Sequence, residues 1–189
     1  CSNRIPEITD AFYKIDDAMK AGFGWENGPF EIWDAIGIEK GIELMKAEGY
    51  QPASWVTDML ASGNTSFYSI KDGATHFYSI TNKKVEKIPG QDAFIILNNI
   101  RESKKIWNNS DSIITDLGDG IINLEFTSKM NSIGAGVLQG INKAIDIAEK
   151  DYNGLVIGNQ GANFSVGANL GMIFMMAVEQ EYDELNMAI

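Results

Sequence analysis

Cysteine and histidine are almost absent from this sequence, and their scarcity excludes two kinds of stabilisation. The 189 residues include one cysteine, Cys1, and one histidine, His76. A lone cysteine cannot close an intrachain disulfide, and one cysteine with one histidine cannot complete a zinc site. We therefore expect no metal centre, and the low cysteine content favours a reducing, cytoplasmic location.

Positive charge and long apolar runs are also scarce. Fifteen Lys and Arg residues stand against 26 Asp and Glu residues, which gives a formal net charge of -11. Such a chain repels phosphate backbones and anionic lipid head groups, so nucleic-acid and membrane-surface partners are disfavoured. The longest apolar run, residues 170–178, is interrupted by Gly171 and is far shorter than the roughly 20 residues of a membrane-spanning helix. No membrane span is expected.

The sequence does contain enough apolar residues for a core, divided between two parts of different character. Hydrophobic residues make up 44% of the chain, and its length suits one domain or two small ones. Residues 1–105 hold 12 basic and 15 acidic residues, whereas residues 106–189 hold 3 and 11. A polar, turn-forming cluster lies at residues 108–112. We predict a domain at residues 1–105, a linker at 106–112 and a second domain at 113–189.

Apolar residues in the first part recur at spacings of three and four, which is typical of amphipathic helices. Two β-rich runs then flank Asp72-Gly73, a pair that favours a tight turn. This pattern predicts an all-helical domain with a small β-hairpin, and it places Asp16-Asp17 on a solvated helix face. The expected helices cover residues 5–19, 30–36, 38–47 and 53–61, and the expected strands cover 67–70 and 76–80.

The second part has a different pattern. β-branched runs on either side of Gly118-Asp119-Gly120 predict a hairpin, which a long amphipathic segment follows. A short apolar run then leads through a glycine-containing loop into an apolar helix. The order is ββαβα, an α/β unit, so the whole chain falls in the α+β class. The expected strands cover residues 113–117, 121–126 and 155–157, and the expected helices cover 133–150 and 168–178.

The glycine-containing loop, residues 158–169, lies between a buried strand and a helix. Backbone N–H groups at the start of a helix lack partners within the helix and are free to bind an anion or an oxyanion. Such a loop can support chemistry without ionisable side chains. The same pattern also fits a tight turn whose glycines serve only packing.

The loop sequence resembles that of a known family. Residues 164–170, FSVGANL, resemble the Phe-x-x-Gly-Ala-Asp loop of the crotonase (enoyl-CoA hydratase and isomerase) superfamily, and residues 124–132 resemble the family's segment that curls around the CoA adenine. The resemblance implies that the backbone N–H of Ala168 is one of two oxyanion donors to a thioester oxygen. It also implies that the CoA substrate is contacted by Lys129, Met130, Asn131, Val166, Gly167 and Ala168.

The sequence departs from that family in two ways. Asn169 stands where the family has Asp, and Gly171 stands where it often has Lys. The chain also ends at Ile189, before the second glycine-rich oxyanion motif and the catalytic glutamates of the family. The resemblance therefore implies a truncated crotonase-like unit that is inactive on its own, because no general base accompanies the single oxyanion donor.

The first part resembles a second family. Residues 22–37, GFGWENGPFEIWDAIG, are similar to the helical C-terminal domain of 3-hydroxyacyl-CoA dehydrogenases, and Arg4-Ile5-Pro6 fits the second copy of that domain in multifunctional β-oxidation proteins. The family's NAD-binding domain lies upstream, so the resemblance implies NAD as a cofactor of the parent protein only. From the residues alone, Pro29 starts a helix, and Phe30 with Trp33 forms an apolar packing face.

Together the two resemblances imply a fragment of a bifunctional fatty-acid β-oxidation enzyme, 3-hydroxyacyl-CoA dehydrogenase and enoyl-CoA hydratase. Its substrate would be an acyl-CoA thioester. The alternatives are a non-catalytic assembly or CoA-binding module, or an enoyl-CoA isomerase. The expected macromolecular partners are the rest of the parent chain and further copies in a homo-oligomer, because the last predicted helix needs a covering layer for its apolar residues.

Overall fold

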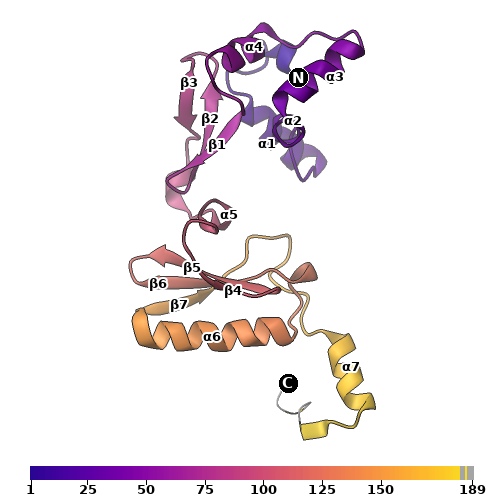
Figure 1. The fold of residues 1–189 in the computed structure, drawn as a ribbon, viewed down its shortest axis with the longest axis vertical. Helices are drawn as coiled ribbons and strands as arrows, with labels where there is room; N and C mark the ends of the chain where they lie inside the picture. Colours follow the sequence, from indigo (N-terminus) through magenta and orange to yellow (C-terminus); the bar gives the residue numbers. More distant parts are fainter. Residues whose placement is uncertain (184–185, 187–189) are drawn as a thin grey trace. The chain divides into compact units, whose positions relative to one another are not determined.

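The chain passes from one folded unit to another between Phe94 and Ile95. The computed structural model describes residues 1–183 and 186. Unit 1 comprises residues 1–94 and unit 2 comprises residues 95–189 (Figure 1). Each unit has its own hydrophobic core. Both units combine helices with a sheet, which confirms the mixed α and β class. Among the described residues, no helix is both long enough and apolar enough to cross a membrane.

Unit 1 contains the predicted helices, but the first begins later than its apolar spacing indicates. Residues 5–12 form turns, and α1 starts only at Tyr13. Here the hydroxyl oxygen of Thr9 accepts a hydrogen bond from the N–H of Ala11 (3.3 Å), a local bond that competes with helix formation. The helical elements are η1 Ser2–Arg4, α1 Tyr13–Phe23, α2 Pro29–Ile36, α3 Ile38–Ala47, α4 Ser54–Ala61 and η2 Gln91–Ala93.

The core of unit 1 is an aromatic cluster around Phe12. The Phe12 ring is fully buried, and its centroid lies 5.0 Å from that of Phe30 and 5.3 Å from that of Phe67. The Trp33 ring joins the cluster through Phe67, at 5.1 Å. This arrangement confirms the packing role predicted for Phe30 and Trp33, since aromatic side chains bury large apolar areas.

Asp16 contradicts the prediction of a solvated helix face. Its exposed fraction is 0%, whereas its neighbour Asp17 is exposed. The carboxylate accepts hydrogen bonds from the N–H of Phe30 (2.9 Å), the N–H of Glu31 (3.1 Å) and the hydroxyl of Tyr68 (2.7 Å). Asp16 on α1 thereby satisfies two backbone N–H groups at the start of α2, which would otherwise lack partners.

The small sheet of unit 1 has one strand more than the predicted hairpin. Strands β1 Tyr68–Lys71, β2 Ala74–Ser79 and β3 Lys84–Lys87 pair antiparallel in that order. The turn at Asp72-Gly73 has the positive φ angles expected of that pair. Strand β3 was missed because it contains a single apolar residue, Val85. Asp34 joins the sheet to α2, since its carboxylate accepts from the N–H groups of Phe67 (2.7 Å) and Tyr68 (2.9 Å).

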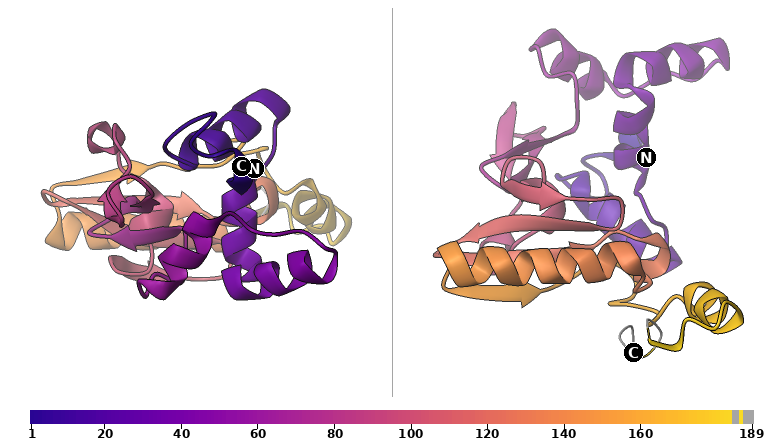
Figure 2. Two further views of the ribbon diagram at one scale, coloured as in Figure 1. Left: turned by 90° about the horizontal axis from the view of Figure 1, so that it is seen from above. Right: turned by 60° about the horizontal axis from the view of Figure 1, so that its bottom comes forward.

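Unit 2 is a four-stranded sheet with a long helix on one face (Figures 1 and 2). The strand order is β4-β5-β6-β7, antiparallel except for the parallel pair β6 and β7, which α6 connects. The predicted ββαβα order is confirmed, and it follows one further helix and strand. The elements are α5 Leu97–Ile100, β4 Lys105–Asn108, β5 Ser112–Gly118, β6 Ile121–Phe126, η3 Lys129–Asn131, α6 Ala135–Asp151, β7 Gly154–Ile157 and α7 Leu170–Val178.

The structure differs from the predicted linker at residues 106–112. Residues 105–108 form strand β4, which pairs with β5, and the Asn109 side chain closes the following turn by accepting from the N–H groups of Asp111 (2.9 Å) and Ser112 (2.8 Å). Clusters of Asn, Ser and Asp are typical of both turns and linkers, because their side chains bond to nearby backbone. Here they form a hairpin turn within unit 2.

The buried Asp16 predicts a large and position-specific loss of stability. We expect Asp16→Ala to lower the free energy of unfolding of unit 1 by about 3 kcal/mol, because it leaves buried donors without acceptors. Asp17→Ala is the matched control and should change it by less than about 0.5 kcal/mol, since that side chain is exposed. Denaturant unfolding by tryptophan fluorescence in a Trp107→Phe background, which leaves tryptophans only in unit 1, measures both. Equal effects of the two variants would contradict this role.

The same carboxylates predict a pH dependence. Burial raises the pKa of Asp16 and of Asp34 above the ordinary value of 3.8. Because the pKa is raised in the folded state, the protonated carboxyl groups add to the free energy of unfolding. This contribution is complete below about pH 3.8 and is lost as the pH rises through the folded pKa. We expect Asp16→Asn, which cannot ionise, to reduce the fall in the free energy of unfolding of unit 1 between pH 4 and pH 7. An unchanged pH slope would show that Asp16 does not contribute.

Candidate functional site

The structure brings together the two segments that carry the predicted site. The η3 turn, Lys129–Asn131, lies against the loop that follows β7. The Ser165 hydroxyl donates to the carbonyl oxygen of Asn131 (2.6 Å), and the Asn131 side-chain amide donates to the carbonyl oxygen of Asn163 (2.9 Å). All six predicted site residues therefore belong to two segments that contact each other.

Ala168 forms an isolated parallel β-bridge with Ile133. The N–H of Ile133 donates to the carbonyl oxygen of Gly167 (2.8 Å), and the N–H of Asn169 donates to the carbonyl oxygen of Ile133 (2.9 Å). Because the residues on either side of Ala168 direct these groups toward Ile133, the N–H and carbonyl of Ala168 itself point the opposite way. Within residues 1–183 the N–H of Ala168 has no hydrogen-bond partner, and the residue is exposed. It can donate to an external acceptor.

The start of α7 is less available than the sequence predicted. The Asn169 side chain caps the helix and accepts from the N–H groups of Gly171 (3.1 Å) and Met172 (3.3 Å). The N–H of Gly167 donates to the Ser165 hydroxyl oxygen (2.9 Å). The expectation that the N–H groups at this helix start are free is therefore wrong for these amides, since Asn is a favoured N-cap residue. The N–H of Ala168, near the end of the loop, has no acceptor among the described residues.

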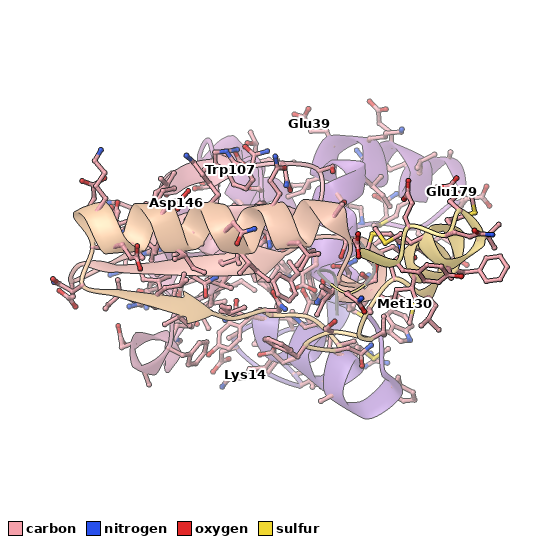
Figure 3. The ribbon with its side chains drawn as sticks, turned by 90° about the horizontal axis from the view of Figure 1, so that it is seen from below. Lys14, Glu39, Trp107, Met130, Asp146 and Glu179 are labelled. Atoms are coloured by element: carbon pink, nitrogen blue, oxygen red, sulfur yellow. The ribbon has the colours of Figure 1, made fainter. Side chains whose placement is uncertain are left out.

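The two segments of the candidate site also expose apolar side chains and one cation. The exposed fractions of the Met130 and Val166 side chains are 59% and 50%, and Met130 is labelled in Figure 3. Lys129 is exposed next to Met130. Gly167 has a φ of +92°, a value that residues with a side chain rarely adopt, so glycine is required there for the loop to reach Ile133.

Two further residues hold the loop and were not predicted. The Asn159 side chain accepts from the N–H of Phe126 and donates to the carbonyl oxygen of Phe164, both at 2.7 Å. The Gln160 side chain accepts from the N–H of Leu97 (2.7 Å) and donates to the carbonyl oxygen of Ile95 (2.6 Å). The sequence signal for these two roles is that both amide side chains follow a predicted strand, separated from it only by Gly158.

The chemistry open to this loop is stabilisation of negative charge on an oxygen atom. Residues 158–169 contain no Asp, Glu, His, Lys or Arg, so the loop itself has no group for proton transfer. A fixed backbone N–H that faces a developing oxyanion needs no ionisable neighbour. Elsewhere in the described part of the chain, no three His, Cys, Asp or Glu side chains gather in a way that could hold a metal ion.

Comparison with known proteins identifies relatives of the whole chain. Residues 9–72 match the family described as 3-hydroxyacyl-CoA dehydrogenase, C-terminal domain. Over 186 residues, 98% of this chain, the sequence is 44% identical to the "probable 3-hydroxyacyl-CoA dehydrogenase" of Bacillus subtilis (strain 168), of which it covers 23%. It is 26% identical over 181 residues, 96% of this chain, to the "putative fatty acid oxidation complex trifunctional enzyme" of Rickettsia felis and that of Rickettsia prowazekii, covering 22% of each. No solved structure matches the chain.

These matches bear differently on the two units. The dehydrogenase C-terminal domain match lies wholly in unit 1 and confirms the resemblance stated for residues 22–37. The alignments to the relatives extend over nearly all of both units. The chain spans less than a quarter of the length of these relatives. The family match at residues 9–72 does not extend into unit 2, so the crotonase resemblance stays a prediction.

The conformation of Gly167 can be tested against a neighbouring glycine. We expect Gly167→Ala to destabilise the loop by about 1–2 kcal/mol, because its φ of +92° strains any side chain, and to shift the amide signals of Ile133 and Asn169. Gly161→Ala is the control, since its added Cβ meets its nearest atoms at 3.6 Å and 3.7 Å, ordinary contact distances. Equal disturbance by the two variants would mean that the bridge does not depend on Gly167.

Proposed function

We propose that this chain is part of a fatty-acid β-oxidation enzyme that acts on acyl-CoA thioesters. In this proposal unit 1 is the C-terminal domain of its 3-hydroxyacyl-CoA dehydrogenase part. Unit 2 is the opening part of an enoyl-CoA hydratase domain of the crotonase type. The names of the relatives from Bacillus subtilis and the two Rickettsia species support the pathway, because the alignments run through both units.

The free N–H of Ala168 is the observation that carries the proposal for unit 2. The carbonyl oxygen of a thioester gains negative charge when the transition state resembles an enolate. A preorganised N–H group stabilises that charge. The parallel bridge to Ile133 fixes the direction of this N–H without any side chain of Ala168. A complete oxyanion hole needs a second donor, which we place outside residues 158–169.

The remaining predicted residues suit the CoA part of the substrate. Met130 and Val166 offer exposed apolar surface, and Lys129 offers a positive charge for a phosphate group. Asn131 has a different role, because its side chain and carbonyl already bond to the loop. We therefore propose that Asn131 shapes the turn and that Lys129, Met130 and Val166 contact the substrate.

The dehydrogenase reaction would use NAD as hydride carrier, but the residues of this chain do not fit that cofactor. A dinucleotide site typically has a Gly-x-Gly-x-x-Gly loop between a strand and a helix, and this sequence contains no such pattern. We propose that NAD binds to another part of the whole enzyme. Unit 1 would then serve the dehydrogenase through packing, in line with its buried aromatic cluster.

A non-catalytic CoA-binding or assembly module is the second candidate. The observation that favours it is the exposed apolar face of α7, where the exposed fractions of Leu170, Phe174 and Val178 are 76%, 67% and 59%. Figures 1 and 2 show α7 lying away from the sheet of unit 2. Such a surface favours association, including a homo-oligomer. An enoyl-CoA isomerase would use the same oxyanion donor as a hydratase.

Titration of the ¹⁵N-labelled 189-residue chain with crotonyl-CoA tests the proposal. We expect amide shifts at residues 166–169 and 129–131, weaker shifts at 166–169 with CoA alone, and no hydration of crotonyl-CoA, because the loop has no group for proton transfer. Lys129→Ala should weaken binding by only about two- to threefold, since it removes one exposed charge.

Gly167→Pro provides the sharp control for that titration. Proline fixes φ near -65° and removes the N–H that bonds to Ser165, so the shifts at residues 166–169 should disappear while the signals of unit 1 stay unchanged. No shift in the wild-type chain at excess crotonyl-CoA would overturn the proposed site. Hydration by the isolated chain would show that catalytic carboxylates lie within it.

A further inference from the structure

The loop that carries Ala168 is held in place mainly by hydrogen bonds. Its apolar side chains contribute little burial, since the exposed fractions of Phe164 and Val166 are 57% and 50%. Hydrogen bonds between side chains and backbone replace the missing packing, as in many surface loops that carry function. The position of the Ala168 N–H therefore depends on the few side chains that make those bonds.

Gln160 makes the longest-range of these connections. Its amide accepts from the N–H of Leu97 and donates to the carbonyl oxygen of Ile95, residues that lie 63 and 65 positions earlier in the sequence. Leu97 is the first residue of α5, so Gln160 satisfies a donor at that helix start. One amide side chain thus bonds to both a C=O and an N–H of the segment that directly follows unit 1 in sequence.

The segment bound by Gln160 is itself anchored at its other end. Leu97 and Ile100 are buried, and the guanidinium of Arg101 forms a two-point ion pair with Glu125 on β6, at 2.8 Å and 3.1 Å. The residue after Glu125 is Phe126, whose N–H donates to Asn159 in the loop. The segment 95–101, strand β6 and the loop are therefore joined in a closed ring of contacts.

The residues of this ring line a cavity of about 210 Å³. The lining includes Arg101, Glu125, Asn159 and Gln160. Two-point ion pairing with a nearly buried carboxylate gives the Arg101 side chain a fixed geometry. The segment 95–101 is therefore a rigid support against which Gln160 can hold the loop.

We propose that Gln160 is a positioning residue for the Ala168 N–H, holding the glycine-containing loop against the backbone of residues 95–97. The inference rests on the proposed function, because it assigns Gln160 a part in binding the thioester oxygen. Gln160 does not touch the substrate. It acts through the loop backbone, which runs from residue 160 to the bridge at Ala168.

Hydrogen exchange of the backbone amides, measured without any ligand, tests whether Gln160 holds the loop in place. In Gln160→Ala, the bonded amides of Gly167 and Asn169 should lose about tenfold in protection, because one to two hydrogen bonds that hold the loop are gone. Gln139→Ala is the matched control, since Gln139 lies on α6 and its side chain bonds to Asn109. Unchanged protection in Gln160→Ala, or equal loss in the control, overturns the inference.

Gln160→Glu separates positioning from a general loss of structure. At pH 7 its carboxylate can accept from Leu97 but cannot donate to Ile95, whereas the protonated carboxyl can do both. A glutamate has an ordinary pKa of about 4.3. We expect the Gly167 and Asn169 amide signals of this variant to move toward their wild-type positions between pH 7 and pH 4, with no such movement in the wild type or in Gln160→Ala. Signals that do not return on acidification would contradict the inference.

Crotonyl-CoA titration of the same variants links the loop to the substrate. Gln160→Ala should weaken the affinity about fivefold and reduce the shift at Ala168, and Gln160→Glu should regain affinity at pH 4. If the wild type does not bind crotonyl-CoA, the proposed function fails while the exchange result still decides whether Gln160 holds the loop. If the wild type binds and Gln160→Ala binds equally well, the positioning role is overturned.

Discussion

Both units depend on one constraint, which is that backbone N–H groups must find acceptors where regular secondary structure stops. At the starts of α2 and β1 in unit 1 the acceptors are carboxylates, those of Asp16 and Asp34. At the loop of unit 2 they are neutral amides, because Asn159 serves Phe126 and Gln160 serves Leu97. The burial of Asp16 makes its bonds especially costly to lose. The difference in charge makes unit 1 sensitive to pH and leaves the loop of unit 2 without ionisable groups.

Local signals in the sequence predicted much of the fold. Helices α2 to α4 follow from apolar spacing between glycines, and the hairpin of β5 and β6 follows from Gly118-Asp119-Gly120. The burial of Asp16 could not be predicted, because its donors lie 14, 15 and 52 residues away. The linker prediction failed because its polar cluster has the same composition as a turn.

The candidate site shows the same division. The resemblance identified Ala168 and the Lys129–Asn131 turn, and the structure brings those segments together. The direction of the Ala168 N–H depends on pairing with Ile133, and the roles of Asn159 and Gln160 depend on partners 33 and 63 residues away. No pattern of residues along the chain encodes such pairings. Polar side chains that follow a buried strand are the one signal that could direct attention to them.

The donor at Ala168 belongs to the main chain, and this has a consequence for how the site can be studied and how it can change. Every amino acid except proline supplies the same N–H, so a scan of side-chain substitutions would pass over the donor that we propose for the loop. Replacing the peptide bond at Ala168 by an ester, through chemical synthesis, would remove that one hydrogen and leave the side chains unchanged. Substitutions at position 168 are therefore limited by the size of the side chain and by the backbone angles. The chemical character of the side chain matters little.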